Sequence, residues 1–134
     1  MNVVFTVYFG LAGLVLGSFI NLAADRIPRG ESLVSPGSHC RSCGRRLNIV
    51  DLVPVAGYLV RGGRCATCRT PIGVSAPVIE AVSAAIMLGP ILAFGVWPGL
   101  VGSLAMVAAW GVAVTMLAAR RAAQAQVEET ISAG

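Results

Sequence analysis

Three long apolar runs dominate the pattern of hydrophobic and polar positions along this chain. Residues 3–24 and 100–119 contain no charged side chain, and residues 77–94 contain only Glu80. A helix needs about 20 apolar residues to cross a hydrocarbon core of ~30 Å. The pattern therefore predicts an all-α membrane protein with about three transmembrane helices. Residues 1–25 would form the first helix, and residues 77–119 would form the second and third as a hairpin.

Composition and charge agree with this prediction and add an orientation. The chain is 56% hydrophobic and 12% charged, whereas soluble domains average about 25% charged residues. Eight of the ten arginines lie at positions 26–69, and the other two follow the third apolar run. Because basic residues collect on the cytoplasmic side, we expect an N-terminus outside the cytoplasm. The loop at 26–76 and a polar tail at 120–134 would then be cytoplasmic.

The basic loop does not indicate nucleic-acid binding. Its arginines are already explained by the charge rule for membrane proteins, and they do not alternate with aromatic residues that could stack on bases. A cleaved secretory signal is not expected either, because the positive charge follows the first apolar run instead of preceding it.

All four cysteines fall into two C-x-x-C pairs, C-R-S-C at 40–43 and C-A-T-C at 65–68. The 21 intervening residues are close to the spacer of about 15–20 found in four-cysteine zinc sites. Four thiolates favour a closed, structural Zn²⁺ site. Disulfides, a redox-active pair and unliganded thiols are alternatives, which a reducing cytoplasm disfavours. We therefore predict as metal ligands Cys40, Cys43, Cys65 and Cys68.

The loop also repeats weakly. A shift of 25 positions overlays Cys40 on Cys65 and Cys43 on Cys68, which predicts two similar metal-binding knuckles. The apolar stretch between them, residues 47–59, is interrupted by proline and glycine and is expected to form short strands or turns. A loop of this size cannot bury a large core, so a bound metal would supply stability. His39 precedes the first pair and is an alternative ligand, although four cysteines complete a site without it.

Two polar side chains interrupt the apolar runs. Asn21 lies a turn before the end of the first run, where an amide needs a hydrogen-bond partner. Glu80 lies near the start of the second, where it would either cap the helix or act as a functional group at the membrane face. Gly13 and Gly17 have the spacing that lets two membrane helices approach closely.

The combined motif resembles a known family. It comprises G-L-V-L-G-S-F-I-N-L-A-A-D-R-I-P-R-G-E-S-L-V-S-P-G-S-H-C-R-S-C-G-R-R-L, then D-L-V-P-V-A-G-Y-L, R-C-A-T-C and P-V-I-E. These residues are similar to the N-terminal part of bacterial type IV prepilin peptidases, the bifunctional prepilin leader peptidase and N-methyltransferase family. The resemblance covers about residues 10–90.

The resemblance implies a multi-pass protein of the bacterial inner membrane that acts on prepilins or secretion pseudopilins. It also implies leader-peptide removal, N-methylation with S-adenosylmethionine as the methyl donor, and a first cytoplasmic loop that carries the cysteine module. Among the matching positions, we take as candidate functional polar residues at the membrane face Asn21, Arg26, Asp51 and Glu80.

The departures from the family qualify its activity. Family peptidases use two aspartates of a C-terminal membrane domain, one of them in a G-x-G-D motif, and this sequence contains no such motif. Its two aspartates, Asp25 and Asp51, belong to the N-terminal pattern. The resemblance thus implies a separate aspartyl peptidase subunit, with methyl transfer as the only autonomous activity. The alternative is a non-enzymatic, zinc-bearing membrane adaptor for pilin or secretion-system assembly.

Overall fold

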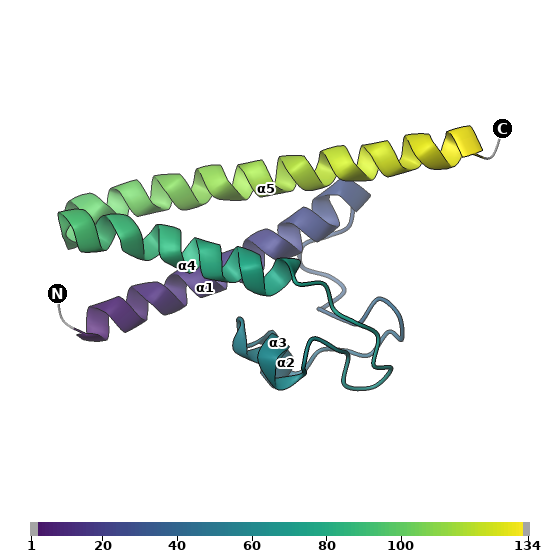
Figure 1. Cartoon of the computed structure of the whole chain (residues 1–134), viewed down its shortest axis with the longest axis horizontal. Helices are drawn as coiled ribbons and strands as arrows, with labels where there is room; N and C mark the ends of the chain where they lie inside the picture. The colour runs from purple at the N-terminus through teal and green to yellow at the C-terminus, as the bar shows by residue number, and fades with distance from the viewer. Residues whose placement is uncertain (1–2, 133–134) are drawn as a thin grey trace.

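Three long helices lie against one another, and a small module formed by residues 30–74 lies beside one end of them (Figure 1). The computed structural model describes residues 3–132, and within them it contains no β-strand. The all-α prediction with three long apolar helices is therefore confirmed. The helical segments are α1 (Val3–Arg26), the 3₁₀ turn η1 (Ile27–Arg29), α2 (Ile49–Leu52), α3 (Ala56–Val60), α4 (Ser75–Phe94) and α5 (Val96–Ser132).

Glycine lets α1 approach α4 closely. A Cβ atom at Gly13 would lie 2.6 Å from the Cα of Ala84, and one at Gly17 would lie 2.6 Å from the Cα of Glu80. Both distances are too short for any side chain, so the two backbones meet directly. The small-residue spacing seen in the sequence is therefore used within the chain, and it is not free to dock a second protein.

The hairpin between α4 and α5 is tighter than the sequence indicated. The predicted apolar runs leave residues 95–99 between them, but only Gly95, at φ 85°, separates the two helices. Pro98 lies in the first turn of α5, where a missing backbone N–H leaves no intrahelical bond unmade. Gly99 then packs directly on α4, because a Cβ there would lie 2.5 Å from the carbonyl oxygen of Pro90.

The core between the three helices is small and mixes apolar with hydroxyl groups. Its buried apolar cluster consists of Ile20, Met87, Ile91 and Val107. Ser103 is fully buried, and its Oγ donates a 2.7 Å hydrogen bond to the carbonyl of Met87 across the α4–α5 contact. Much of the remaining apolar surface points outward. The exposed side chains of α1 include Phe5, Tyr8, Leu11, Val15 and Phe19. An outward apolar surface of this kind suits lipid.

The last helix is far longer than a bilayer requires. It has 37 residues, which at 1.5 Å per residue gives roughly 55 Å, and its C-terminal part extends past the other helices in Figure 1. Residues 120–132, assigned to a polar tail, continue this helix without a break. They are rich in alanine, glutamine, glutamate and arginine, which are strong helix formers.

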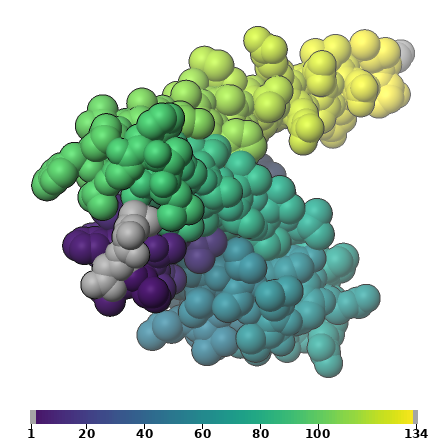
Figure 2. Space-filling view, turned by 60° about the vertical axis from the view of Figure 1, so that its left-hand side comes forward, coloured from purple at the N-terminus to yellow at the C-terminus, as the bar shows by residue number. Residues whose placement is uncertain are grey.

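Residues 30–74 form the module, which lies beside α1 and α4 (Figure 2). Short strands or turns were expected over residues 47–59; the strands are wrong, because the short helices α2 and α3 occupy most of this stretch, with a turn between them. Asn48 explains the start of α2. Its side chain accepts the Asp51 N–H, and the Asp51 carboxylate accepts the Asn48 N–H, which together make a capping box.

Candidate metal centre and adjoining cavity

The two C-x-x-C segments fold into the same knuckle, so the predicted repeat is confirmed. In the first, Cys40 N–H donates to the Arg45 carbonyl at 2.8 Å; in the second, Cys65 N–H donates to the Thr70 carbonyl at 3.0 Å. A second pair of bonds repeats likewise, from Gly44 N–H to the Cys40 carbonyl and from Arg69 N–H to the Cys65 carbonyl. Each bond in one knuckle corresponds to one in the other, displaced by 25 residues.

A left-handed residue closes each knuckle. Gly44 has φ 71° in the first, and Arg69 has φ 60° at the equivalent place in the second. Only glycine adopts this conformation without a steric cost. The second knuckle therefore keeps the same turn although its sequence disfavours it. A 3.2 Å hydrogen bond from the Thr70 hydroxyl to Ser42 Oγ joins the two knuckles.

The repeat brings the four thiols to one point. All four Sγ atoms, which we call the cysteine cluster, lie within 4.8 Å of one another. Cys40 and Cys68 are 3.8 Å apart, and Cys43 and Cys65 are 3.9 Å apart. Tetrahedral coordination with Zn–S bonds of about 2.3 Å gives S–S separations of about 3.8 Å. The cluster thus has the donor type, number and spacing that a tetrahedral metal ion requires.

These distances do not fit the alternatives as well. A disulfide needs about 2.05 Å between sulfurs, and all four cysteines are free thiols. His39 does not join the cluster; its Nδ1 lies 2.9 Å from the carbonyl oxygen of Gly37.

Neighbouring groups shift the thiol pKa values of the cluster in both directions. A backbone hydrogen bond with Arg45 lowers the pKa of Cys43, but burial and hydrogen bonds with the other three thiols outweigh it and raise that pKa to about 11, whereas the pKa values of Cys65 and Cys68 are lowered. Cys68 Sγ lies 3.3 Å from the Thr70 hydroxyl oxygen, and hydrogen bonding with the Thr70 side chain and backbone lowers the pKa of Cys68 to about 6. Hydrogen bonds to Asp51, and to a lesser extent to Cys65, raise the pKa of the Arg45 guanidinium. Arg45 therefore places a permanent positive charge beside Cys65, which suits a thiolate ligand.

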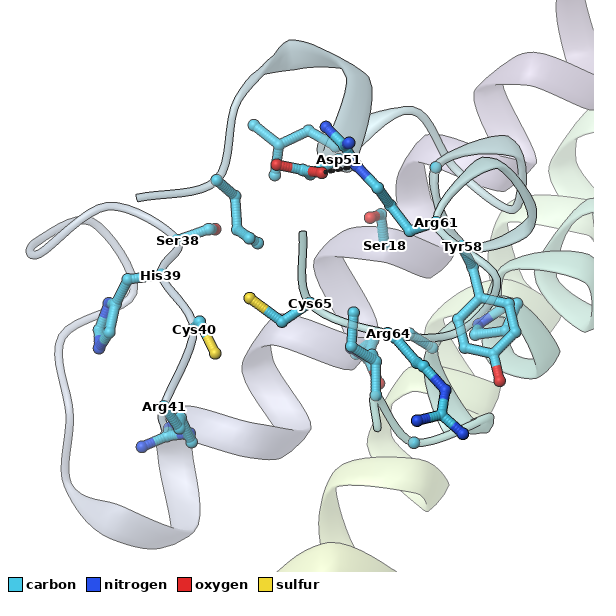
Figure 3. Close-up of a pocket in the computed structure, with 18 of the residues that line it drawn as sticks. Ser18, Ser38, His39, Cys40, Arg41, Asp51, Tyr58, Arg61, Arg64 and Cys65 are labelled. Carbon is cyan, nitrogen blue, oxygen red and sulfur yellow. Dashed lines mark hydrogen bonds and ion pairs between the residues drawn. The ribbon is translucent and has the colours of Figure 1, made fainter. Parts of the chain in front are cut away.

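A cavity of about 690 Å³ separates the cysteine knuckles from the ends of α1 and α4 (Figure 3). We call it the junction cavity. Its size lies within the range of about 300–1,000 Å³ typical of small-molecule sites. Cys40 and Cys65 form part of its wall, so the metal-ligand candidates and the cavity adjoin. The structure also brings to this cavity the four candidate polar residues, Asn21, Arg26, Asp51 and Glu80.

Asp51 is held by two arginines. Its carboxylate accepts hydrogen bonds from Arg45 at 2.7 Å and from Arg61 at 2.6 Å, and its side chain is only 6% exposed. Burial raises the pKa of Asp51, but the Asn48 N–H and the two arginines outweigh it and lower that pKa to about 2. A carboxylate with so low a pKa is a poor proton acceptor, so its geometry is that of a clamp between knuckle and helix α3.

Arg26 and Glu80 each tie the module to a long helix. The buried Arg26 guanidinium, at the end of α1, donates to the carbonyls of Ser32 at 2.6 Å and Pro36 at 2.8 Å. The Glu80 carboxylate, in α4, accepts the backbone N–H of Val55 at 2.6 Å. Both side chains are therefore anchors for loop backbone.

Asn21 differs from the other three candidates. It is half-buried on α1, and its amide has no hydrogen-bond partner among residues 3–132. Of the four predicted polar residues, it is therefore the one left available to a ligand in the junction cavity. Sequence reasoning missed the arginine partners of the acids: Arg45 and Arg61 on Asp51, and Arg41 on Asp25 and Glu31. The sequence signal that could have revealed these ion pairs is the excess of arginine in a loop with so few acids.

Comparison with known proteins identifies relatives of this arrangement. The family described as the bacterial peptidase A24 N-terminal domain matches residues 11–94, which include most of α1, the whole module and all of α4. No solved structure matches the chain.

The similar curated proteins are prepilin-processing enzymes by name. A prepilin leader peptidase/N-methyltransferase of Burkholderia pseudomallei (strain K96243) is 35% identical over 131 residues, covering 79% of this chain and 40% of that protein. One of Myxococcus xanthus (strain DK1622) is 33% identical, with 77% and 31% covered. A type 4 prepilin-like proteins leader peptide-processing enzyme of Escherichia coli O78:H11 is 31% identical, with 80% and 46% covered. The chain thus spans less than half the length of each.

Proposed function

The chain belongs to the family of the bacterial peptidase A24 N-terminal domain, and we propose that it is the N-terminal module of a membrane enzyme that processes prepilins or pseudopilins. The observation that carries the proposal is the extent of the family match: it takes in most of α1, the cysteine cluster and all of α4 as one arrangement. Leader-peptide removal and N-methylation are the reactions that the names of the relatives give.

We propose that the cysteine cluster holds a structural Zn²⁺ ion. Support comes from four sulfur donors at tetrahedral spacing. Four sulfurs leave no coordination position for substrate, so the ion would supply stability and fix the knuckles against each other. The chain's own residues would then shape the junction cavity beside it.

We further propose that a separate aspartyl peptidase subunit supplies the hydrolytic step. An aspartyl dyad needs two carboxyl groups that share a proton. Here Asp25 is ion-paired with Arg29 and Arg41, and Asp51 with Arg45 and Arg61, so each carboxylate already has two cationic partners. Neither is suited to activating water, and a partner's aspartates would do so.

Purification of the native complex tests the partnership. The chain, tagged and extracted from its own membrane in mild detergent, is expected to copurify with a membrane protein that carries a G-x-G-D motif, and the complex is expected to cleave prepilin. A pure native assembly with no such peptidase would contradict the partnership. It would favour the other candidate function, a zinc-bearing adaptor that positions pilins or assembly proteins.

Methyl transfer is the one reaction we propose this chain could perform itself, with S-adenosylmethionine as donor. The supporting observation is the unpartnered Asn21 amide in a cavity of suitable size. Asn21→Ala is expected to weaken S-adenosylmethionine binding in calorimetry of the zinc-loaded, partner-bound protein, while Gln124→Ala, which removes an exposed amide on α5 outside the cavity, leaves it unchanged. No measurable binding by the unaltered complex would end this proposal.

Orientation follows from the same reasoning. We propose an inner-membrane protein with its N-terminus outside and the module and residues 120–132 in the cytoplasm. The arginine distribution supports this arrangement, since both arginine-bearing regions then lie on one side. Thiol labelling of Cys43, the exposed member of the cluster, in metal-stripped intact cells and in inverted vesicles would distinguish the two orientations.

A further inference from the structure

The segment 49–60, which contains α2 and α3, exposes several large apolar side chains close together in the sequence. Four of its large apolar side chains are exposed and lie outside the lining of the junction cavity: Ile49 (83% exposed), Val60 (70%), Leu59 (69%) and Val50 (47%), whereas Leu52 and Val53 line that cavity. The one charged residue of the segment, Asp51, points inward to its arginines. A contiguous stretch of this kind, free of outward charge, marks a surface that contacts something apolar.

The position of the segment indicates what that contact is. Val55 N–H bonds Glu80, which lies five residues inside α4. At 1.5 Å per residue, the segment therefore reaches about 7–8 Å along α4 from its first residue. Since α4 has 20 residues, about the length that crosses the hydrocarbon core, this depth lies in the outer part of the acyl-chain region. Figure 1 shows α2 and α3 beside the first half of α4, whereas the remaining module loops extend past its end.

The backbone at the tip is also arranged for a site without water. Pro54 has no N–H, Val55 N–H is taken by Glu80, and Gly57 N–H bonds the Val53 carbonyl. Ala56 N–H bonds the Pro54 carbonyl at 2.5 Å. Irregular backbone tolerates the edge of a bilayer only when its polar groups are satisfied in this way.

Charge on either side of the segment complements anionic lipid. Arg46 precedes it and Arg64 follows it; both are exposed, and neither has a carboxylate partner in the described part of the chain. Exposed arginine beside outward apolar groups is the combination by which interfacial helices bind anionic membrane surfaces.

We propose that residues 49–60 insert into the bilayer leaflet on the module's side, with Arg46 and Arg64 contacting anionic headgroups. The three long helices provide the continuous lipid-facing surface that this segment extends. The segment anchors the module beside the membrane, so that the junction cavity opens at the interface. This inference does not depend on the proposed enzymatic function.

Depth-dependent fluorescence quenching tests the insertion. In the full chain with Trp97 and Trp110 replaced by phenylalanine, Leu59→Trp provides a single probe. Val34→Trp provides the control, because Val34 is 88% exposed but lies outside the segment. In nanodiscs of phosphatidylcholine and phosphatidylglycerol, acyl-chain bromine is expected to quench the probe at position 59 severalfold more than the control, with acrylamide giving the reverse order. Equal acrylamide access at both positions would overturn the proposal, and would show a surface left open for a protein partner.

Lipid charge tests the role of the arginines. Phosphatidylglycerol is expected to deepen the probe at position 59 relative to phosphatidylcholine alone, and the pair Arg46→Gln and Arg64→Gln is expected to abolish that difference. The matched control is Arg120→Gln with Arg121→Gln, which removes the same charge from α5. An equal loss of the lipid effect in both double variants, or no lipid effect at all, would contradict specific headgroup contact.

Discussion

At the scale of single residues, three charged side chains that line the junction cavity hold arginine or loop backbone in place. Asp51 joins the first knuckle to α3, Arg26 gathers the loop that follows α1, and Glu80 fixes the tip before α3. Each of these three charged groups already has a hydrogen-bond partner within the chain. The four thiols differ from these groups, because their Sγ atoms lie beside one another and form the cysteine cluster.

Removing one thiol should therefore remove the metal and loosen the loop without deleting a catalytic group. Cys40→Ser is expected to lower the zinc content from about one ion per chain, since three sulfurs bind the ion less well than four. Residues 38–72 should then become sensitive to protease. Elemental analysis and limited proteolysis measure both effects, with Ala66→Ser, inside the second C-x-x-C turn, as the control. Unchanged metal content and protease resistance in Cys40→Ser would refute the metal assignment.

The Asp51 clamp predicts a pH dependence. Its pKa of about 2 in the folded chain lies below the usual 3.8, so the clamp stabilises the module above about pH 4 and is lost as the pH falls towards 2. Arg61→Gln should raise the pKa of Asp51 and reduce module stability near neutral pH by roughly 1 kcal/mol. Carboxyl carbon-13 NMR measures the pKa; Arg29→Gln, which affects Asp25, is the control. An unchanged pKa of Asp51 in the Arg61→Gln variant would show that the ion pair between Asp51 and Arg61 is not formed.

At the scale of elements, close backbone contact holds α1 on α4. Gly17→Ala is expected to lower the free energy of unfolding by about 1–3 kcal/mol, because the added methyl group overlaps the α4 backbone. Gly10→Ala is the matched control, since its Cβ would lie an ordinary 3.5 Å from Leu88 Cδ1. Thermal unfolding in one detergent compares the two. Equal stabilities would mean that the helices do not pack as described.

The link between α4 and α3 can be tested by amide exchange. Val55 has φ 57°, a conformation that β-branched residues rarely adopt, and the Glu80 carboxylate holds its N–H. Glu80→Ala is expected to speed exchange at Val55 by roughly tenfold, as the loss of ~1.4 kcal/mol would. Glu80→Gln keeps an acceptor oxygen and should stay near the original rate. Similar exchange rates at Val55 in all three proteins would show that this bond does not hold the tip.

Prediction from sequence succeeded where spacing alone determines structure. The length of the apolar runs was enough for α1, α4 and α5, and the two C-x-x-C pairs with their 25-residue repeat were enough for the cysteine cluster. It failed for α2, because four residues give no helical periodicity and the Asn48–Asp51 capping box is a local feature. The partner of Gly17 could not be predicted either, since a small-residue spacing does not say which helix it meets.

At the scale of the whole molecule, the chain combines a lipid-facing helical bundle with a cysteine module pinned to it at Arg26 and Glu80. Between them lies the junction cavity, which is lined by both Asn21 and the cysteine knuckles. The family match covers residues 11–94 of this arrangement, without α5, and the chain spans less than half the length of the similar prepilin-processing proteins. The central claim is that this half of the arrangement serves prepilin processing together with a peptidase half.

Mass spectrometry of a prepilin N-terminus tests that claim most directly. Tagged prepilin would be co-expressed with this chain, with a G-x-G-D peptidase subunit, and with both. The account predicts that complete processing requires both chains, and the mass of the new N-terminus, with or without a methyl group, would show which step this chain serves. Identical leader removal and methylation by the peptidase subunit alone would contradict the account and leave the adaptor function in its place.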